Sequence, residues 1–183
     1  MKKRLLIFVF IFLIIGISVF LWHYFTKEDT TSFSEYTPQE EISEEQARQS
    51  LVTLYFLSKE NNTLMPEARL IDAKLLATNP YFTLVSLLIN GPKNEKLKTT
   101  IPTGTKLNNV VLEKDMAIVD LSEEFIKDIK LGAEEESKIV YSIVNTLVEL
   151  TEIESVKILI NGKENMEFAD GAIKFDQPFV KID

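Results

Sequence analysis

Residues 133–150 read AEEESKIVYSIVNTLVEL, a sequence that predicts one long amphipathic helix. At about 100° per residue, its apolar side chains share one broad face, as expected for a helix that packs on a sheet. That face comprises Ile139, Val140, Ile143, Val144, Leu147 and Leu150. Three glutamates in the first turn suit the positive end of the helix dipole. A strand at Val156–Ile160 follows the helix and ends at Asn161-Gly162.

The residues before this helix also alternate between strand-like and helix-like patterns. Leu51–Leu57 is rich in β-forming residues and predicts a buried strand. Leu64–Ala73 predicts a weaker second strand, interrupted by Pro66. Asn79-Pro80 predicts the start of a helix, with asparagine as the N-cap and proline in the first turn. Asn90-Gly91-Pro92 predicts its end, because glycine adopts the left-handed conformation and proline cannot continue a helix.

A hairpin is predicted between these two helices. Leu107–Leu112 and Met116–Leu121 are its strands, and Ser122 is expected to cap a short helix directly after it. Ala172–Phe175 predicts a last strand. The order of elements is therefore β-(β)-α-β-β-α-α-β-(β). This order predicts an α+β fold in which helices pack on one face of a small mixed β-sheet.

An uncharged apolar segment, Leu5–Phe25, follows the basic N-terminus Met1-Lys2-Lys3-Arg4. Its length meets the requirement of about 20 residues for a transmembrane helix. The segment is longer than the apolar region of a cleaved signal peptide and lacks a small-x-small cleavage site, so we expect an uncleaved signal anchor in the cell membrane. Because basic flanks stay inside, residues 1–4 are expected to be cytoplasmic and everything after residue 25 extracytoplasmic.

Residues 26–49 predict an acidic extracytoplasmic linker. They contain seven acidic and two basic side chains and few apolar ones, too few to form a core. The remaining residues, 50–183, are numerous enough for one folded domain. The chain is therefore expected to consist of a cytoplasmic N-terminus (1–4), a transmembrane anchor (5–25), a linker (26–49) and a domain (50–183).

The composition excludes several classes of function. A net charge of −8 argues against nucleic acid as a partner, because such binding begins with the neutralisation of phosphates. There is no cysteine, and the only histidine, His23, lies in the apolar segment. The sequence contains neither a glycine-rich phosphate loop nor a Gly-x-Ser-x-Gly motif. We therefore expect no catalytic residues, no cofactor, no metal and no enzymatic activity.

Three polar side chains are candidate interaction residues. Arg69 lies in an otherwise apolar strand and is expected either to pair with an acid such as Asp120 or to be exposed to a partner. Asp120 and the glutamates at 123–124 form a carboxylate cluster that suggests acid–base chemistry or a calcium site, although a helix start explains it better. Asn145 is expected on the polar side of its helix together with Ser142, where it either holds a neighbouring loop or contacts a partner.

Seven short segments together resemble the GerMN domain family, a module associated with sporulation and spore germination. In the order of the family they are Val52–Phe56, Leu64–Arg69, Leu87–Pro92, Ile101–Thr105, Val119–Phe125, Val144–Leu150 and Val156–Gly162. The resemblance implies a non-enzymatic extracytoplasmic module whose fold is similar to the ring-building motifs of secretion-like assemblies. The family's namesake has two copies of the domain, whereas residues 50–183 show no internal repeat.

Together, the anchor and the resemblance predict a membrane-anchored extracytoplasmic protein-interaction module, a structural component of the sporulation or spore-germination machinery. Its expected partners are other extracytoplasmic or membrane proteins, including those of a sporulation channel complex. The alternative is a module that binds cell-wall glycan or a small ligand, which would need a groove lined by exposed aromatic residues. The aromatic residues Tyr55, Phe56, Tyr81 and Phe82 are all expected to be buried. A hydrolase is disfavoured because the expected domain has neither histidine nor cysteine.

Overall fold

The computed structural model describes residues 14–24 and 48–181, which belong to two separate compact units, residues 1–42 and 43–183. In the first unit, residues 14–24 are α-helical. A search of the described residues finds no helix with both the length and the apolarity needed to cross a membrane. The rest of the predicted anchor and most of the predicted linker lie outside the described residues, so both stay predictions.

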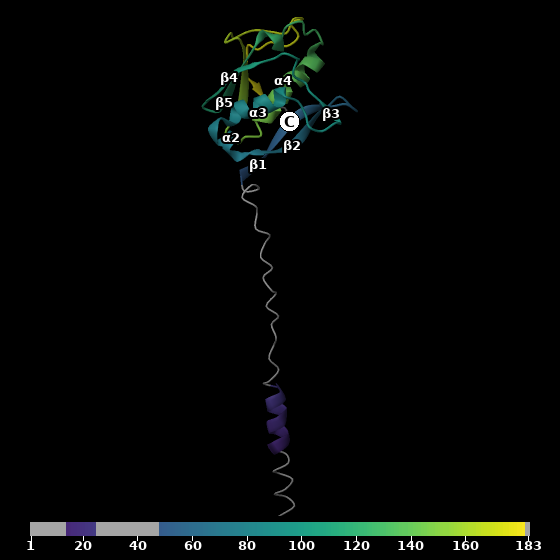
Figure 1. Ribbon diagram of the computed structural model, residues 1–183, viewed down its shortest axis with the longest axis vertical. Helices are drawn as coiled ribbons and strands as arrows, with labels where there is room; N and C mark the ends of the chain where they lie inside the picture. Colours follow the sequence, from purple (N-terminus) through teal and green to yellow (C-terminus); the bar gives the residue numbers. More distant parts are fainter. Residues whose placement is uncertain (1–13, 25–47, 182–183) are drawn as a thin grey trace, which may run out of the picture. The chain divides into compact units, whose positions relative to one another are not determined.

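The second unit contains two β-sheets (Figure 1). In the first sheet, of order β2-β1-β3, strand β1 (Gln49–Ser58) pairs antiparallel with β2 (Leu64–Asp72). At its far end β1 also pairs with the short strand β3 (Leu97–Lys98). Alternate residues of β1 enter the core, and Leu54 and Phe56 are fully buried. The two strands predicted at the start of the domain are therefore present.

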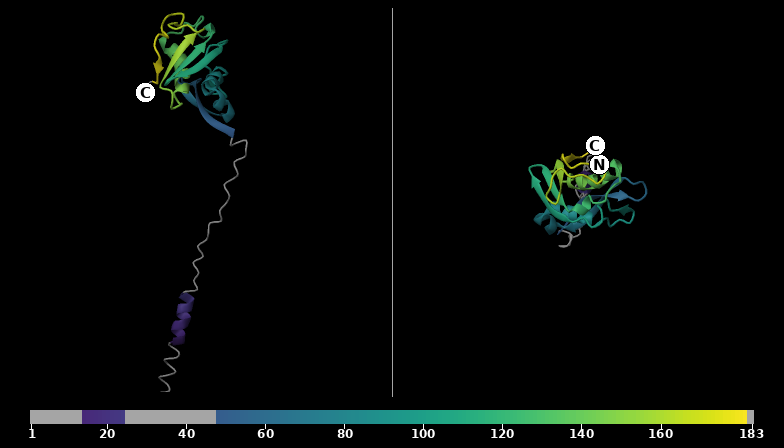
Figure 2. Two further views of the ribbon diagram at one scale, coloured as in Figure 1. Left: turned by 90° about the vertical axis from the view of Figure 1, so that its left-hand side faces the viewer. Right: turned by 90° about the horizontal axis from the view of Figure 1, so that it is seen from above.

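The second sheet has the order β4-β5-β6-β7. The predicted hairpin consists of β4 (Leu107–Glu113) and β5 (Met116–Leu121). Strand β6 (Ser155–Ile160) pairs parallel with β5, and the two-residue strand β7 (Phe179–Val180) pairs antiparallel with β6. Figure 2 shows the strands of this sheet side by side. Parallel neighbours need a crossover connection, and here the connection contains the long helix α4 (Ala133–Leu147).

Two helices contact both sheets. Helix α3 (Pro80–Ile89) contacts β1, β4 and α4, and α4 contacts β1 and β6. The α+β class is therefore confirmed, but the single sheet with helices on one face is wrong. The amphipathic patterns identify the strands and the apolar helix faces correctly. They do not show that β1 and β4 belong to different sheets and pack against the same helix α3.

Several predicted boundaries need correction. The segment after β2 forms a short helix that was not predicted, α2 (Ala73–Thr78), and the side chain of Asp72 caps it by accepting the N–H of Lys74. Helix α4 ends at Leu147 rather than Leu150. No strand forms at 172–175; the last strand is β7.

Ser122 does not cap the short helix that follows β5. This element is a 3-10 turn, η2 (Glu123–Phe125), and it has no side-chain cap. The Ser122 hydroxyl instead accepts a hydrogen bond from the N–H of Lys106, at 2.9 Å. The hydroxyl therefore fixes the segment before β4, and its hydrogen bond to the Glu124 carboxylate lowers the pKa of that acid.

Three phenylalanines close one end of the core. The ring of Phe125 lies 5.7 Å from that of Phe168 and 6.1 Å from that of Phe175, measured between centroids. Phe168 and Phe175 meet edge to face at 5.3 Å. All three are at most 1% exposed. The segment after β6 therefore belongs to the core although it has little regular structure.

Candidate interaction surface

Arg69 forms a buried ion pair with Glu67 on the core face of β2. The exposed fractions of the two residues are 5% and 8%. The Nε of Arg69 donates to Oε1 of Glu67 at 3.0 Å, and Nη2 donates to the same oxygen. Arg69 therefore pairs with an acid, as one of the two alternatives predicted, but the acid is Glu67 rather than Asp120, and Arg69 is not exposed to a partner. The pairing of Arg69 with Glu67 could have been predicted from the sequence, because residues two apart in a strand lie on the same face.

This ion pair holds the segment that follows α3. Nη2 of Arg69 also donates to the carbonyl of Gly91, and the Glu67 carboxylate accepts the N–H groups of Lys93 and Asn94 at 2.9 and 2.8 Å. Gly91 has a φ of +86°, a conformation that favours glycine. Burial raises the pKa of Glu67, but the N–H of Asn94, the Arg69 guanidinium and the N–H of Lys93 together lower it more, so the pKa lies below its usual value.

Two adjoining hollows lie where β2 meets this segment, and we call them together the β2 groove. The first, of about 530 Å³, lies between the hairpin turn 58–61, the start of β2 and residues 94–97. The second, of about 360 Å³, is lined by residues 66–69 and 93–94. Pro66 and Asn94 line both hollows. The first has the size of a small-ligand pocket.

The β2 groove is locally basic in an acidic protein. Lys59, Lys93 and Lys96 line it, are exposed and form no ion pair within the described part of the chain. Two carboxylates line the groove, Glu60 and Glu67, and Glu67 is neutralised by Arg69. Because the chain as a whole carries a net charge of −8, this excess of lysine favours an anionic partner at the groove.

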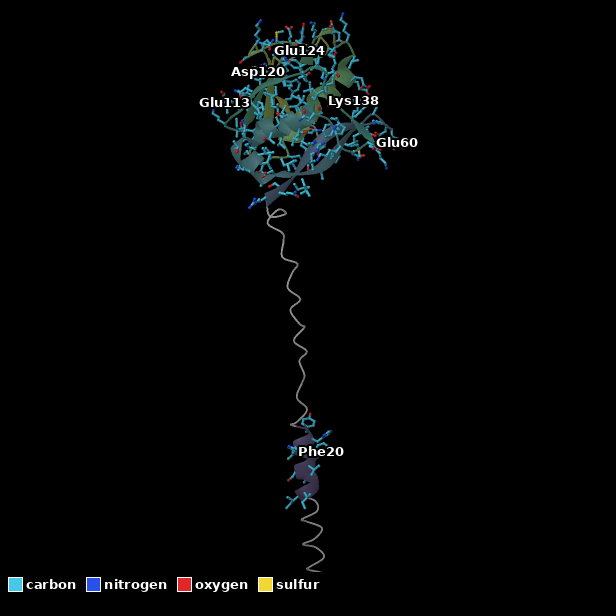
Figure 3. All side chains as sticks on the ribbon, viewed as in Figure 1. Phe20, Glu60, Glu113, Asp120, Glu124 and Lys138 are labelled. Atoms are coloured by element: carbon cyan, nitrogen blue, oxygen red, sulfur yellow. The ribbon has the colours of Figure 1, made fainter. Side chains whose placement is uncertain are left out.

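Asp120 does not belong to the β2 groove. In the view of Figure 3, Asp120 lies toward the upper left of the domain and the groove residue Glu60 at its right-hand edge. Its Oδ1 accepts the N–H of Gly162 at 2.8 Å, so this carboxylate fixes the turn after β6. No group of three or more acidic or histidine side chains among the described residues is arranged to hold a metal ion. The role of Asp120 in an interaction stays a prediction.

Asn145 is half-buried on α4, and its amide makes no hydrogen bond to the rest of residues 48–181. The expected tie between the helix and a loop is made by Ser142 instead. Ser142 is fully buried rather than on a polar face, and its hydroxyl accepts a hydrogen bond from Thr100 at 2.7 Å. A contact of Asn145 with a partner stays a prediction.

Glu136 is a buried acid on α4 that was not predicted. It is 0% exposed, its Oε1 accepts the N–H of Leu131 at 3.4 Å, and its Oε2 has no partner. It lies on α4 three and four residues before Ile139 and Val140, so its place on the apolar face was visible in the spacing. Because a buried acceptor without a donor is costly, burial of this oxygen disfavours the ionised form of Glu136.

Asp170 is the charged group that faces Glu136. The two carboxyl groups are within hydrogen-bonding reach, but two carboxylates are both acceptors. Burial and then Asp170 raise the pKa of Glu136. The N–H of Ala172, followed by Glu136 and the N–H of Gly132, lowers the pKa of Asp170. The two pKa values are therefore shifted in opposite directions, and Glu136, on α4, is the weaker acid of the pair that it forms with Asp170 in the loop after β6.

Comparisons of the sequence place these features in a known family. The family model described as "Germane: Sporulation and spore germination" matches residues 53–166, more than half of the chain. The spore germination protein GerM of Bacillus subtilis (strain 168) is 37% identical over 89 residues. That match covers 46% of this chain and 24% of GerM, so the chain matches about a quarter of the length of this relative.

Solved structures agree on the fold. The first GerMN domain of B. subtilis GerM matches 72% of this chain and 98% of its own length, with a TM-score of 0.60 and 26% identity. The tandem GerMN domains of GerM match with a TM-score of 0.62 and 21% identity, over 74% of this chain and 47% of theirs. A putative lipoprotein from Clostridium perfringens matches 74% of this chain and 89% of its own length, with a TM-score of 0.51 and 24% identity. The family model, the relative and the first GerMN domain confirm the predicted resemblance, and the chain belongs to the Germane (GerMN) family of sporulation and spore germination.

Proposed function

We propose that this chain is a membrane-anchored extracytoplasmic protein-interaction module of the sporulation or spore-germination machinery, without catalytic activity of its own. The observation that carries the proposal is the family match over residues 53–166, which spans most of the folded unit. This match supports a role in sporulation or spore germination. The remaining parts of the proposal rest on the chemistry of the domain and on the N-terminal sequence.

The chemistry of the folded unit supports binding rather than catalysis. Residues 48–181 contain no histidine and no cysteine. Glu67 is bound by two backbone N–H groups and by Arg69, and Glu136 is fully buried, so neither acid can reach a substrate. An acid or base must reach the proton that it transfers. These two side chains therefore stabilise the folded structure.

The N-terminal sequence supports attachment to a membrane. The uncharged segment 5–25 follows three basic residues, which favours an N-terminus in the cytoplasm and a domain outside it. Attachment raises the effective concentration of neighbouring membrane proteins around the domain. Individually weak contacts are then sufficient for assembly.

The alternative function, binding of cell-wall glycan or a small ligand, has less support. No aromatic side chain lines the β2 groove. Of the four aromatic residues expected to be buried, Phe56 is fully buried and the other three are half-buried. The hydroxyls of Tyr55 and Tyr81 donate to Glu149 and Glu152, so these rings are held by neighbouring acids.

Photo-crosslinking in native membranes tests the proposal. A photoreactive residue is placed at Glu60, in the β2 groove, or at Lys163, which is exposed and does not line it. We expect a crosslink to another extracytoplasmic or membrane protein from at least one position, and a defect in spore formation or germination when the gene is deleted. The proposal fails if neither position yields a crosslinked protein, or if the purified chain hydrolyses peptidoglycan.

A further inference from the structure

The backbone of β2 presents hydrogen-bonding groups at an open edge. The N–H of Tyr55 donates to Oγ1 of Thr146 on α4, at 3.0 Å, so it points away from β2. Tyr55 and its partner Pro66 therefore form a non-hydrogen-bonded pair. Because such pairs alternate with hydrogen-bonded ones, Thr53↔Ala68 and Leu51↔Leu70 are of the same kind. The backbone groups of Pro66, Ala68 and Leu70 must then point to the outer edge of β2.

This outer edge has no strand partner among the described residues, where β2 pairs with β1 alone. The N–H groups of Ala68 and Leu70, with the carbonyls of Pro66, Ala68 and Leu70, are therefore available to an added strand. Pro66 has no N–H, which leaves this one position of the edge without a donor. An unprotected edge of this kind is a template for another extended chain.

The two faces beside this edge differ in chemistry. On the outer face, Leu70 lies opposite Leu51, and the two side chains are 59% and 67% exposed. On the other face lies the β2 groove, with Lys59, Lys93 and Lys96. The side chains of an added strand would point alternately to these two faces. Complementarity thus requires apolar side chains at every second position and acidic ones between them.

We propose that the free edge of β2 binds an extended segment of a partner protein as an additional strand, with acidic side chains in the β2 groove and apolar side chains against Leu51 and Leu70. The inference rests on the proposed function and names the chemistry of the partner. A second copy of this chain is a poor occupant, because the folded domain, with 21 acidic and 15 basic residues, repels itself.

The test measures binding of a synthetic peptide to the full chain in detergent micelles. The probe is a fluorescent peptide in which glutamate and valine alternate, and fluorescence anisotropy reports its binding. One control peptide replaces glutamate with lysine, and a second carries N-methyl groups on alternate amides, which removes its edge-facing donors. We expect saturable binding of the glutamate peptide alone, weakened by salt because lysines contribute to it.

Protein variants locate the site. Ala68→Pro removes an N–H that points outward, leaves the β1 pairing intact and is expected to weaken binding about tenfold. Reversal of two groove charges, Lys93→Glu with Lys96→Glu, is expected to weaken binding about fivefold or more. The matched control, Lys130→Glu with Lys163→Glu, makes the same change in net charge at exposed positions outside the groove and should bind as the wild type does.

Circular dichroism shows whether each variant is folded, and the N-methylated peptide tests the edge without any change in the protein. The inference is overturned if the N-methylated or lysine peptide binds as well as the glutamate peptide. Equal competition by polyphosphate would assign the groove to polyanions in general. Binding that appears only after deletion of residues 26–42 would show that the chain's own acidic linker occupies the edge. None of these results contradicts the proposed function, because crosslinking to a partner through another surface would still support it.

Discussion

Replacement of Arg69 by methionine should strongly destabilise the folded unit. Methionine keeps much of the apolar contact of the arginine with Phe56, whose ring centroid lies 5.7 Å from the guanidinium carbon. The carboxylate of Glu67 then remains at 8% exposure with two N–H donors but no positive charge. Removal of one partner of a buried ion pair typically costs about 3–5 kcal/mol. Because the two donors remain, we expect about 3 kcal/mol.

A double-mutant cycle separates the ion pair from general packing. Glu67→Met alone leaves the guanidinium with the carbonyl of Gly91 and should cost a similar amount. The double variant removes both charges, and because Lys93 and Asn94 are exposed residues, we expect water to bind their N–H groups in place of Glu67. It should therefore be more stable than either single variant, a clear departure from additivity.

The assay is urea unfolding of residues 43–183, the compact unit that contains the whole core. Lys163→Met, at an exposed position, is the control and should change the free energy of unfolding by less than about 0.5 kcal/mol. Because the folded-state pKa of Glu67 is lowered, the ion pair contributes to the free energy of unfolding at pH values above the usual pKa of 4.5. This contribution is lost as the pH falls from 4.5 through the folded-state pKa. A loss below about 1 kcal/mol for Arg69→Met at neutral pH, or a double variant less stable than both single ones, would refute the reasoning.

Three further outcomes are expected. Leu147→Ala should cost about 2–5 kcal/mol in urea unfolding, because Leu147 is fully buried on α4, and a cost below about 0.5 kcal/mol would contradict that packing. Because the pKa of Glu136 is raised, its contribution to the free energy of unfolding is complete below the usual pKa of 4.5 and is lost as the pH rises through the folded-state pKa. In Glu136→Gln the amide can donate to Asp170 at any pH, so this loss should be absent from a plot of Tm against pH. Protease added to intact protoplasts should digest the chain beyond residue 26, whereas protection of residues 50–183 would reverse the proposed orientation.

The elements that were predicted correctly have signals that are local in the sequence. Asn79-Pro80 sets the start of α3, where the asparagine side chain accepts the N–H of Phe82. The residues between β4 and β5 form the expected hairpin turn, with Lys114 at a φ of +60°. The apolar spacing of 133–147 identifies the buried face of α4. In each case neighbouring residues determine the conformation.

The elements and contacts that were missed depend on packing between distant residues. Strands β3 and β7 have two residues each and exist because β1 and β6 offer them hydrogen bonds. The division into two sheets follows from where α3 packs. The acid that pairs with Arg69 was not identified because Arg69 was compared with a distant acid, Asp120, whereas its partner Glu67 lies two residues away. The β2 groove could not be predicted, because it forms only when the segment after α3 folds back onto β2.

The three phenylalanines at the end of the core bear on where the domain stops. The family match ends at residue 166, yet Phe168 and Phe175 lie beyond it and are at most 1% exposed. A protein cut at the family boundary would lose both rings and leave Phe125 beside an open cavity. Loss of a buried phenylalanine side chain costs about 3–5 kcal/mol, and two such losses approach the total stability of an ordinary domain. The cooperative folding unit is therefore longer than the segment by which the family is recognised, and during synthesis it cannot be completed until the last phenylalanine has left the ribosome.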